Sequence, residues 1–377
     1  MSLKSFLSLA LLSATVSLHA QEWRPADPDA TPEAVQLFQR LIKIQKTGTM
    51  FGHQDDLVTG DTWNLVPGSP FLGEPGNSDT RTATGDYPAV AGFELGEIEL
   101  GGEHSLDNVY FDVIRERAKW FHSQGGIVTV SWHLVNPISS QWPGIKEPNG
   151  AGSAWEVGFL SAEGENAVRS VLPGGCNNAM FNSWLDRLSN FFLSWTDSEG
   201  KLIPFLFRPY HEHSGTFFWW GKERCFDEEY AALWRYTVDY LRAKGLHNIL
   251  YMYNTDKVWS AEEYLAGYPG DEYIDVLSID WYGAGEKFNI DITRALKFTT
   301  DLARERGKLH ALSECGPLSG DLQEILTGYE SAYVLIWRNA PSDRPRPAHP
   351  GPTQADLLRM LKANSRYLFL EDIKGIE

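Results

Sequence analysis

The sequence predicts an α/β fold, a single (β/α)8 barrel of the TIM type. Three features indicate it. Eight short apolar runs recur along the 377 residues, amphipathic helical stretches follow most of them, and each run ends in polar or aromatic residues. Apolar strands that alternate with helices are typical of a parallel sheet covered on both faces, and eight such units favour a closed barrel. The competing fold, an open doubly wound sheet, needs a glycine-rich phosphate turn after an early strand, and the sequence has no such turn.

The predicted strands are rich in β-branched or aromatic residues, which favour extended backbone. In chain order they are Met50–Gln54, Pro88–Glu94, Gly126–His133, Leu202–Glu212, Asn248–Asn254, Val276–Tyr282, His310–Gly316 and Tyr333–Arg338. Helical periodicity is clearest in Leu106–Gln124, Met180–Trp195, Asp227–Ala243, Asp291–Arg306 and Gln354–Asn364. A helix over Thr31–Gln45 precedes the first strand, since Thr31 suits the N-cap and Pro32 the first helical position. Segments 96–106 and 134–179 have the composition of binding-site loops.

The N-terminal residues are typical of a signal peptide. Lys4 precedes a mostly apolar run, Phe6–Leu18, which is too short to span a bilayer, and the small residue Ala20 follows it. We therefore expect residues 1–20 to be removed, residues 21–377 to form one domain, and the protein to be secreted or periplasmic. No later run is long and apolar enough for a membrane helix.

The composition limits the kinds of binding partner that we expect. A formal net charge of −17 repels phosphate backbones, so we expect no nucleic acid partner, whereas a neutral substrate is not penalised. We expect a monomer. The 14 tryptophans suit sugar-stacking surfaces and a tryptophan-rich core equally well. The three cysteines, Cys176, Cys225 and Cys315, leave at least one thiol unpaired, and a Cys176–Cys225 disulfide is an open alternative.

Two carboxylates stand at the ends of predicted strands, where barrel enzymes hold their chemistry. Glu212 closes the fourth strand and Glu314 closes the seventh, each among aromatic residues. Cleavage of a glycosidic bond needs a proton donor at the leaving oxygen and a second carboxylate near the anomeric carbon. A separation of about 5 Å gives retention of configuration, and a wider gap admits water and gives inversion. The pair therefore predicts a glycosidase.

Two other interpretations of these residues are open. Glu212 or Glu314 could simply pair with Arg208 at the rim, but two such glutamates in one aromatic mouth make this explanation weak. A metal could be bound by His211 and His213 together with His133. Because side chains alternate along a strand, His211 and Glu212 are not expected to reach one ion. We therefore expect no metal and no cofactor.

Several motifs together resemble glycoside hydrolase family 26, a family of β-mannanases with catalytic carboxylates on the fourth and seventh strands. The motifs are Phe51-Gly52-His53-Gln54-Asp55, Trp132-His133, Arg208-Pro209-Tyr210-His211-Glu212, Phe218-Trp219-Trp220-Gly221, Ser278-Ile279-Asp280-Trp281-Tyr282-Gly283, Ser313-Glu314-Cys315-Gly316 and Trp337-Arg338-Asn339. The resemblance implies a retaining endo-β-1,4-mannanase whose catalytic domain is the barrel. Its substrates would be mannan, galactomannan, glucomannan and manno-oligosaccharides.

The resemblance also implies roles for single residues. Glu212 matches the general acid/base and Glu314 the nucleophile. His211 matches a histidine that helps to orient the nucleophile, and Tyr282 matches a tyrosine that hydrogen-bonds it. His133 and Trp337 match residues around the sugar that is attacked, with Trp337 as the stacking platform.

Three further residues, Arg208, Phe217 and Trp219, are predicted to bind substrate. The sequence departs from the family pattern at His213, where a small polar residue is usual, and at Phe217, where tryptophan is usual. These departures concern the subsite for the leaving group.

Other activities stay open at this level. Related barrels act as β-1,3-xylanases or mixed-linkage β-glucanases. A non-catalytic sugar-binding barrel is disfavoured because both Glu212 and Glu314 are present. The long segment 134–179 leaves open whether the enzyme cleaves within chains or releases mannobiose from chain ends.

Overall fold

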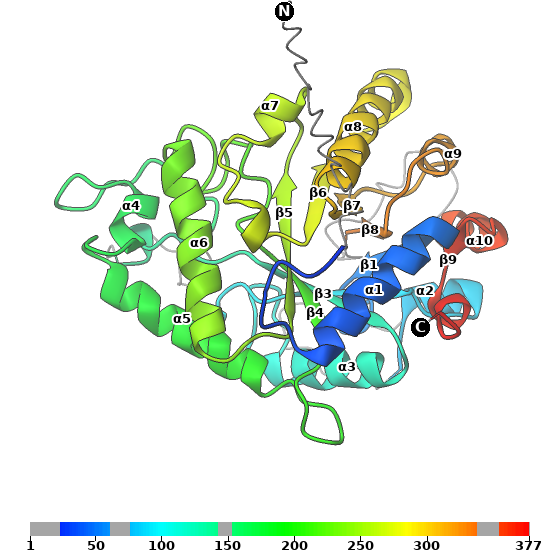
Figure 1. Cartoon of the computed structure of the whole chain (residues 1–377), viewed down its shortest axis with the longest axis horizontal. Coiled ribbons are helices and arrows are strands. Elements are labelled where there is room, and N and C mark those ends of the chain that lie inside the picture. The colour runs from blue at the N-terminus through cyan, green and yellow to red at the C-terminus, as the bar shows by residue number, and fades with distance from the viewer. Residues whose placement is uncertain (1–22, 61–75, 142–152, 338–353, 377) are drawn as a thin grey trace, which may run out of the picture.

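The computed structural model describes residues 23–60, 76–141, 153–337 and 354–376 (Figure 1). The predicted signal peptide lies outside these residues, as do Arg338 and Asn339 at the end of the last predicted strand. Within the described ranges, no helix is long and apolar enough to cross a membrane.

Eight parallel strands close into a barrel, which confirms the predicted fold. The strands are β1 (Thr49–Gln54), β2 (Val90–Glu94), β3 (Ile127–Trp132), β4 (Phe205–Pro209), β5 (Ile249–Thr255), β6 (Val276–Trp281), β7 (Leu309–Cys315) and β8 (Tyr333–Ile336). Each strand pairs with the next, and β1 pairs with both β2 and β8, so the sheet has no free edge among these eight. A two-residue strand, β9 (Tyr367–Leu368), also pairs with β1.

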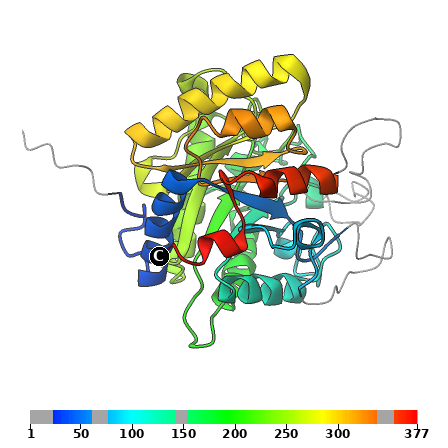
Figure 2. The ribbon, with the colours of Figure 1, turned by 90° about the vertical axis from the view of Figure 1, so that its right-hand side faces the viewer.

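Helices surround the strands on the outside (Figures 1 and 2). The six predicted helices correspond to α1 (Pro32–Thr47), α3 (Phe111–Ser123), α5 (Asn178–Leu193), α6 (Asp227–Ala243), α8 (Gly285–Glu305) and α10 (Gln354–Ala363). The shorter helices are α2 (Asp79–Thr84), α4 (Ala167–Val171), α7 (Ala261–Tyr264), α9 (Gly320–Leu326), α11 (Leu370–Ile373) and the 3₁₀ turns η1 (Ile98–Leu100), η2 (Ser139–Gln141) and η3 (Asp271–Tyr273). The predicted N-cap is confirmed, since Thr31 Oγ1 accepts from the Ala34 N–H at 3.2 Å.

The fourth strand is shorter than predicted. The sequence pattern extends it to Glu212, but β4 ends at Pro209. Tyr210 and Glu212 have φ angles of 50° and 53°, which is left-handed backbone and cannot continue a strand. The alternation of side chains along a strand therefore does not apply to His211 and Glu212, and that argument against a shared metal fails.

Most of the tryptophans that the structure describes belong to the core. Six of them are among the largest side chains that are essentially buried: Trp132, Trp195, Trp219, Trp220, Trp234 and Trp281. Trp155 and Trp259 differ, since they are 49% and 44% exposed. The six buried tryptophans are thus explained by core packing. Core packing does not explain the exposed Trp155 and Trp259.

The Cys176–Cys225 disulfide does not form. All three cysteines are free thiols, with Cys176 exposed and Cys315 buried in β7. The Cys225 thiol instead contacts the carbonyl oxygen of Trp220 at 3.6 Å.

Candidate active site

The two predicted catalytic carboxylates meet at the mouth of the barrel. Glu314 lies in β7, and Glu212 lies three residues beyond the end of β4. One carboxylate oxygen of each, together with one of Asp280 in β6, lie within 4.8 Å of one another. A separation of about 5 Å suits direct attack by one carboxylate on an anomeric carbon, whereas about 6.5 Å or more is needed to admit a water molecule.

Glu314 is held by two donors. The Tyr282 hydroxyl donates to Oε2 at 2.7 Å, and the Arg208 guanidinium donates to Oε1. Arg208 also donates to Asp280 Oδ2 at 2.7 Å. Burial and the Glu314 charge raise the pKa of Tyr282 well above its usual range, so this hydroxyl stays protonated and remains a donor. Glu314 is therefore fixed in position with its charge partly offset.

Glu212 has the properties of an acid. Its side chain is buried, and burial raises the pKa of Glu212 well above the usual value. The charges of Glu314, Asp280 and Asp256 raise it further, and Arg208 opposes them. Burial and the neighbouring charges thus favour the protonated form of Glu212, the form that a proton donor to a leaving oxygen needs.

The backbone at Glu212 is strained and is held by Asn254. Non-glycine residues in left-handed backbone cost free energy and persist when their surroundings impose that conformation. The Glu212 N–H donates to Asn254 Oδ1 at 2.7 Å. His213 Nδ1 donates to the Asn254 carbonyl oxygen at 2.9 Å. Asn254, at the end of β5, therefore fixes the residues on which the acid is carried.

A buried chain of hydrogen bonds continues from Asn254 to the nucleophile. Asn254 Nδ2 donates to Asp280 Oδ1 and to Ser313 Oγ, both at 2.8 Å. Asp280 in turn accepts from Arg208, which binds Glu314. Burial, opposed by Arg208, raises the pKa of Asp280 to about 7. No role was predicted for Asn254 and Asp280, although their positions at the ends of the fifth and sixth strands mark them as residues of the mouth.

His133 and His211 form a second network with Glu94. His133 Nδ1 lies 2.8 Å from Glu94 Oε2, and His133 Nε2 lies 3.0 Å from His211 Nε2. Burial lowers the pKa of His133, but the adjacent Glu94 charge raises it overall. Burial and the charge of His133 lower the pKa of His211. Both shifts in pKa favour a proton on His133 in this bond, with His211 as the acceptor. The predicted part of His211 in orienting Glu314 stays a prediction.

Aromatic rings surround His133. Trp155 stacks on it, with centroids 5.1 Å apart and planes at 21°, and Trp337 lies 5.9 Å away at a steep angle. Phe217 is 37% exposed. Half-buried or exposed rings of this kind offer faces to sugar rings. The sequence predicted Trp337 and Phe217 for this purpose but missed Trp155, because that residue lies in a long loop with no regular pattern.

Trp219 departs from its predicted role. Its side chain is only 1% exposed, and its indole N–H donates to the Leu134 carbonyl oxygen at 3.0 Å. Almost none of the ring is left to contact a sugar. Trp219 instead supports the loop that follows β3.

The histidines considered for a metal make other contacts. His213 Nδ1 and Nε2 each lie 2.9 Å from a backbone carbonyl oxygen, those of Asn254 and Ala266. His211 is bonded to His133. His133 and His211 are thus bonded to each other, whereas His213 contacts backbone carbonyl oxygens.

Replacing Tyr282 with phenylalanine should lower kcat/KM about 10-fold to 100-fold, because a hydrogen bond to a carboxylate is lost while the ring keeps its packing. Steady-state kinetics on any cleaved substrate measures this. Tyr273→Phe is a matched control, since its hydroxyl bonds Asp239 on the surface. Equal activity of the two variants would exclude a role for Tyr282.

The fold and the site together define a class of protein. A (β/α)8 barrel whose mouth pairs a buried glutamic acid of raised pKa with a second glutamate, with carboxylate oxygens within 4.8 Å of each other, is typical of glycoside hydrolases. Residues 26–340 match the family model described as glycosyl hydrolase family 26, and the chain belongs to that family.

Known proteins of this kind are similar over most of the chain. A mannan endo-1,4-β-mannosidase from Bifidobacterium adolescentis is 33% identical over 347 residues, covering 83% of this chain and 32% of that protein. The chain thus spans about a third of that relative's length. The solved structure of a family 26 β-mannanase from Bacteroides ovatus is 37% identical, with a TM-score of 0.80, and covers 92% of this chain and 98% of that chain. A modular endo-β-1,4-mannanase from Cellulomonas fimi is 27% identical, with a TM-score of 0.78 over 94% of this chain and 79% of that chain.

Proposed function

We propose that this protein hydrolyses β-1,4-mannosidic linkages in mannan, galactomannan, glucomannan and manno-oligosaccharides, with retention of configuration. The observation that carries the reaction type is the pair Glu212 and Glu314, whose oxygens lie within 4.8 Å of each other. The substrate is supported by the relatives, which are named as enzymes that act on mannan.

The first step forms a covalent intermediate. Glu314 attacks the anomeric carbon, and the bond to the leaving oxygen breaks as Glu212 transfers its proton to that oxygen. Arg208 and Tyr282 keep the attacking carboxylate aimed along this path, since both of its oxygens are already bonded. The leaving part of the chain departs as an alcohol.

The second step releases the sugar. Once Glu314 is bound as an ester, its negative charge no longer raises the pKa of Glu212, so the deprotonated Glu212 becomes an effective base. Glu212 takes a proton from water, the water oxygen attacks the anomeric carbon, and the bond to Glu314 breaks. Two inversions give net retention.

Two measurements test this proposal. Reducing-sugar assays on mannan, β-1,3-xylan and mixed-linkage β-glucan should show activity on mannan, and proton NMR should detect the β-anomer as the first product. Activity on xylan or glucan alone would replace the substrate assignment with one of the alternatives. No hydrolysis of any of them would favour a sugar-binding barrel, and an α-anomer formed first would overturn the retaining mechanism.

A product time course on mannohexaose and galactomannan separates two modes of action. A ladder of oligomers indicates cleavage within chains. Mannobiose alone from the earliest times indicates release from chain ends. We also propose a secreted or periplasmic monomer, which mass spectrometry of the mature N-terminus and light scattering would test.

Asp256→Asn should move the alkaline limb of the pH–activity profile to lower pH by a few tenths of a unit. Activity is lost as pH rises through the pKa of Glu212, because the acid must carry a proton. The Asp256 charge raises that pKa, so its removal lowers it. Asp301→Asn on α8, an exposed pair partner of Lys297, is the control. An unchanged limb in Asp256→Asn would contradict the assignment of this limb to Glu212.

A further inference from the structure

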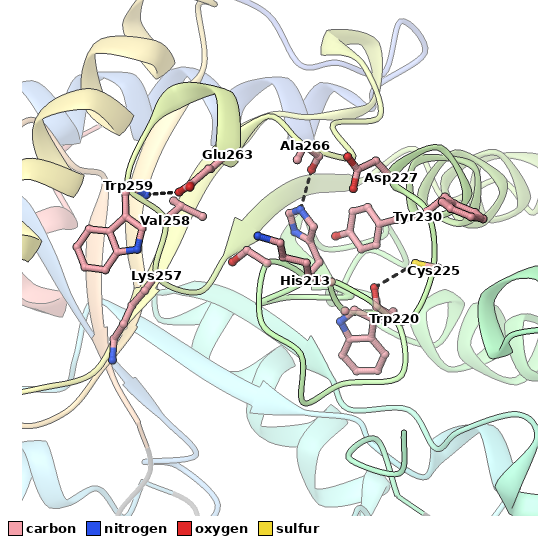
Figure 3. A pocket seen from close by; sticks show the side chains of 14 residues that line it. His213, Trp220, Cys225, Asp227, Tyr230, Lys257, Val258, Trp259, Glu263 and Ala266 are labelled. Atoms are coloured by element: carbon pink, nitrogen blue, oxygen red, sulfur yellow. Dashed lines mark hydrogen bonds between the residues drawn. The ribbon is translucent and has the colours of Figure 1, made fainter. Parts of the chain in front are cut away.

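His213 directly follows Glu212, and its ring is buried where the turn after β4 meets two other segments (Figure 3). Figure 3 shows the ring beside Tyr230, which belongs to α6, and near the backbone of Ala266, which lies between β5 and β6. The family pattern has a small polar residue at this position. Such a side chain is too short to reach both neighbours, so the contacts of this ring need an explanation of their own.

The two ring nitrogens contact different segments. Nδ1 donates to the Asn254 carbonyl oxygen at 2.9 Å, and Nε2 lies 3.0 Å from the Tyr253 hydroxyl and 2.9 Å from the Ala266 carbonyl oxygen. Burial lowers the pKa of His213, although the two carbonyl oxygens and the Asp227 charge oppose this shift, so the neutral ring is favoured. A neutral ring that donates at Nδ1 accepts at Nε2, and the Tyr253 hydroxyl is the donor on that side.

The ring also stacks on Tyr230, which holds the turn that carries the acid. The two ring centroids are 4.2 Å apart, with planes at 20°, and the Tyr230 hydroxyl donates to the Tyr210 carbonyl oxygen at 2.9 Å. Tyr210 and Glu212 are the two residues of this turn with left-handed backbone, and Asn254 binds the N–H of Glu212. His213 therefore joins the residue that supports one strained position to the residue that supports the other.

This support matters for the acid more than for the nucleophile. Left-handed backbone at residues other than glycine costs free energy and persists where the surroundings impose it. If the support is lost, the turn can relax and carry the Glu212 carboxyl away from the leaving oxygen, and small displacements of a reacting group are costly in rate. Glu314 has supports of its own in Arg208 and Tyr282.

We propose that His213 is a positioning residue for Glu212. Its ring locks the strained turn after β4 onto β5, onto α6 and onto the segment between β5 and β6, and so places the acid at the leaving oxygen. The proposal rests on the proposed β-mannan hydrolysis and assigns part of the proton donation to a side chain that acts through its neighbour.

The test compares two substrates that differ in their need for a proton. His213→Phe keeps the stacking on Tyr230 and removes both polar contacts. With mannohexaose, kcat/KM should fall about 10-fold to 100-fold, mainly through kcat, because the sugar oxygen must receive a proton to leave. With 2,4-dinitrophenyl β-mannobioside, kcat/KM should fall less than about threefold, because that phenolate leaves unaided.

Two further variants separate positioning from general support of the fold. His213→Asn keeps a donor near the position of Nδ1 and should recover most of the activity on mannohexaose that His213→Phe loses. His247→Phe is the matched control, since His247 precedes β5 at the opposite end of the barrel and its Nδ1 lies 2.9 Å from Asp27 Oδ2. This control should leave the ratio of the two kcat/KM values unchanged. If His213→Phe fails to fold, His213→Gln gives the same test, because its amide lies beyond the position of Nδ1.

The possible outcomes distinguish the proposal from the function on which it rests. A ratio in His213→Phe equal to that of the unmodified enzyme would overturn the positioning role, whether activity on both substrates was kept or fell equally. A loss in His213→Asn as large as that in His213→Phe would also overturn it, because the bond to Asn254 would then not carry the effect. If the unmodified enzyme cleaved neither substrate, the proposed β-mannan hydrolysis itself would fail, before any variant was compared.

Discussion

Glu314→Ala should abolish the turnover of every mannan substrate, with kcat lowered by at least about 10⁴-fold. Without this carboxylate no covalent intermediate forms. The small space that the truncated side chain leaves does not place a water molecule correctly for direct displacement. Steady-state assays on mannan and on an aryl β-mannobioside measure the loss. Glu330→Ala, at an exposed position after α9, is the matched control.

Azide, used as an external nucleophile, gives a second test of the role of Glu314. In Glu314→Ala, azide can enter the vacated space and attack the anomeric carbon of the aryl substrate, displacing the phenolate. One displacement gives an α-mannosyl azide. Near-normal activity on mannan, or a β-mannosyl azide from this variant, would contradict the role of Glu314 as nucleophile.

Glu212→Ala should separate substrates by their leaving groups. On mannan, kcat/KM should fall about 10²-fold to 10⁴-fold, because the sugar oxygen needs a proton to leave. With 2,4-dinitrophenyl β-mannobioside, kcat/KM should fall less than about tenfold, because that phenolate leaves unaided. The second step then lacks its base, so a burst of phenolate followed by slow turnover is expected.

Azide again distinguishes the two glutamates. In Glu212→Ala it should attack the intermediate on Glu314 and speed turnover of the activated substrate, giving a β-mannosyl azide after two displacements. Equal losses on mannan and on the dinitrophenyl substrate would show that Glu212 does not act as the acid. Thermal unfolding of both variants checks that the barrel remains intact.

The barrel could be predicted because its signals are local. The eight apolar runs correspond to the eight strands of the barrel, and helices separate them as predicted. The helix Asp227–Ala243 has the predicted bounds. The placement of Glu212 and Glu314 at one mouth follows from the same topology. Because the carboxyl ends of all eight parallel strands meet at the same mouth, the residues predicted at the ends of the apolar runs could be assigned to the site.

The details around the acid could not be predicted, because they depend on contacts between distant segments. Tyrosine and glutamate have no preference for left-handed backbone, and the turn after β4 is imposed by Asn254 from the next strand. Similarly, nothing local distinguishes the buried Trp219 from the exposed Trp155. The hydrogen bond between His211 and His133 was not predicted for the same reason, since Glu94 lies in β2 and His133 directly follows β3.

The chain of hydrogen bonds from Glu212 through Asn254, Asp280 and Arg208 to Glu314 is supported by four adjacent strands of the barrel. The gap between acid and nucleophile is therefore set by these strands together with the short turn after β4 that carries Glu212. We expect that the loops after β3 and β5, and the part of the loop after β4 beyond this turn, can change in length without altering the anomeric outcome. For engineering, this means that the range of accepted chains and the stereochemistry of cleavage are independent variables in this barrel.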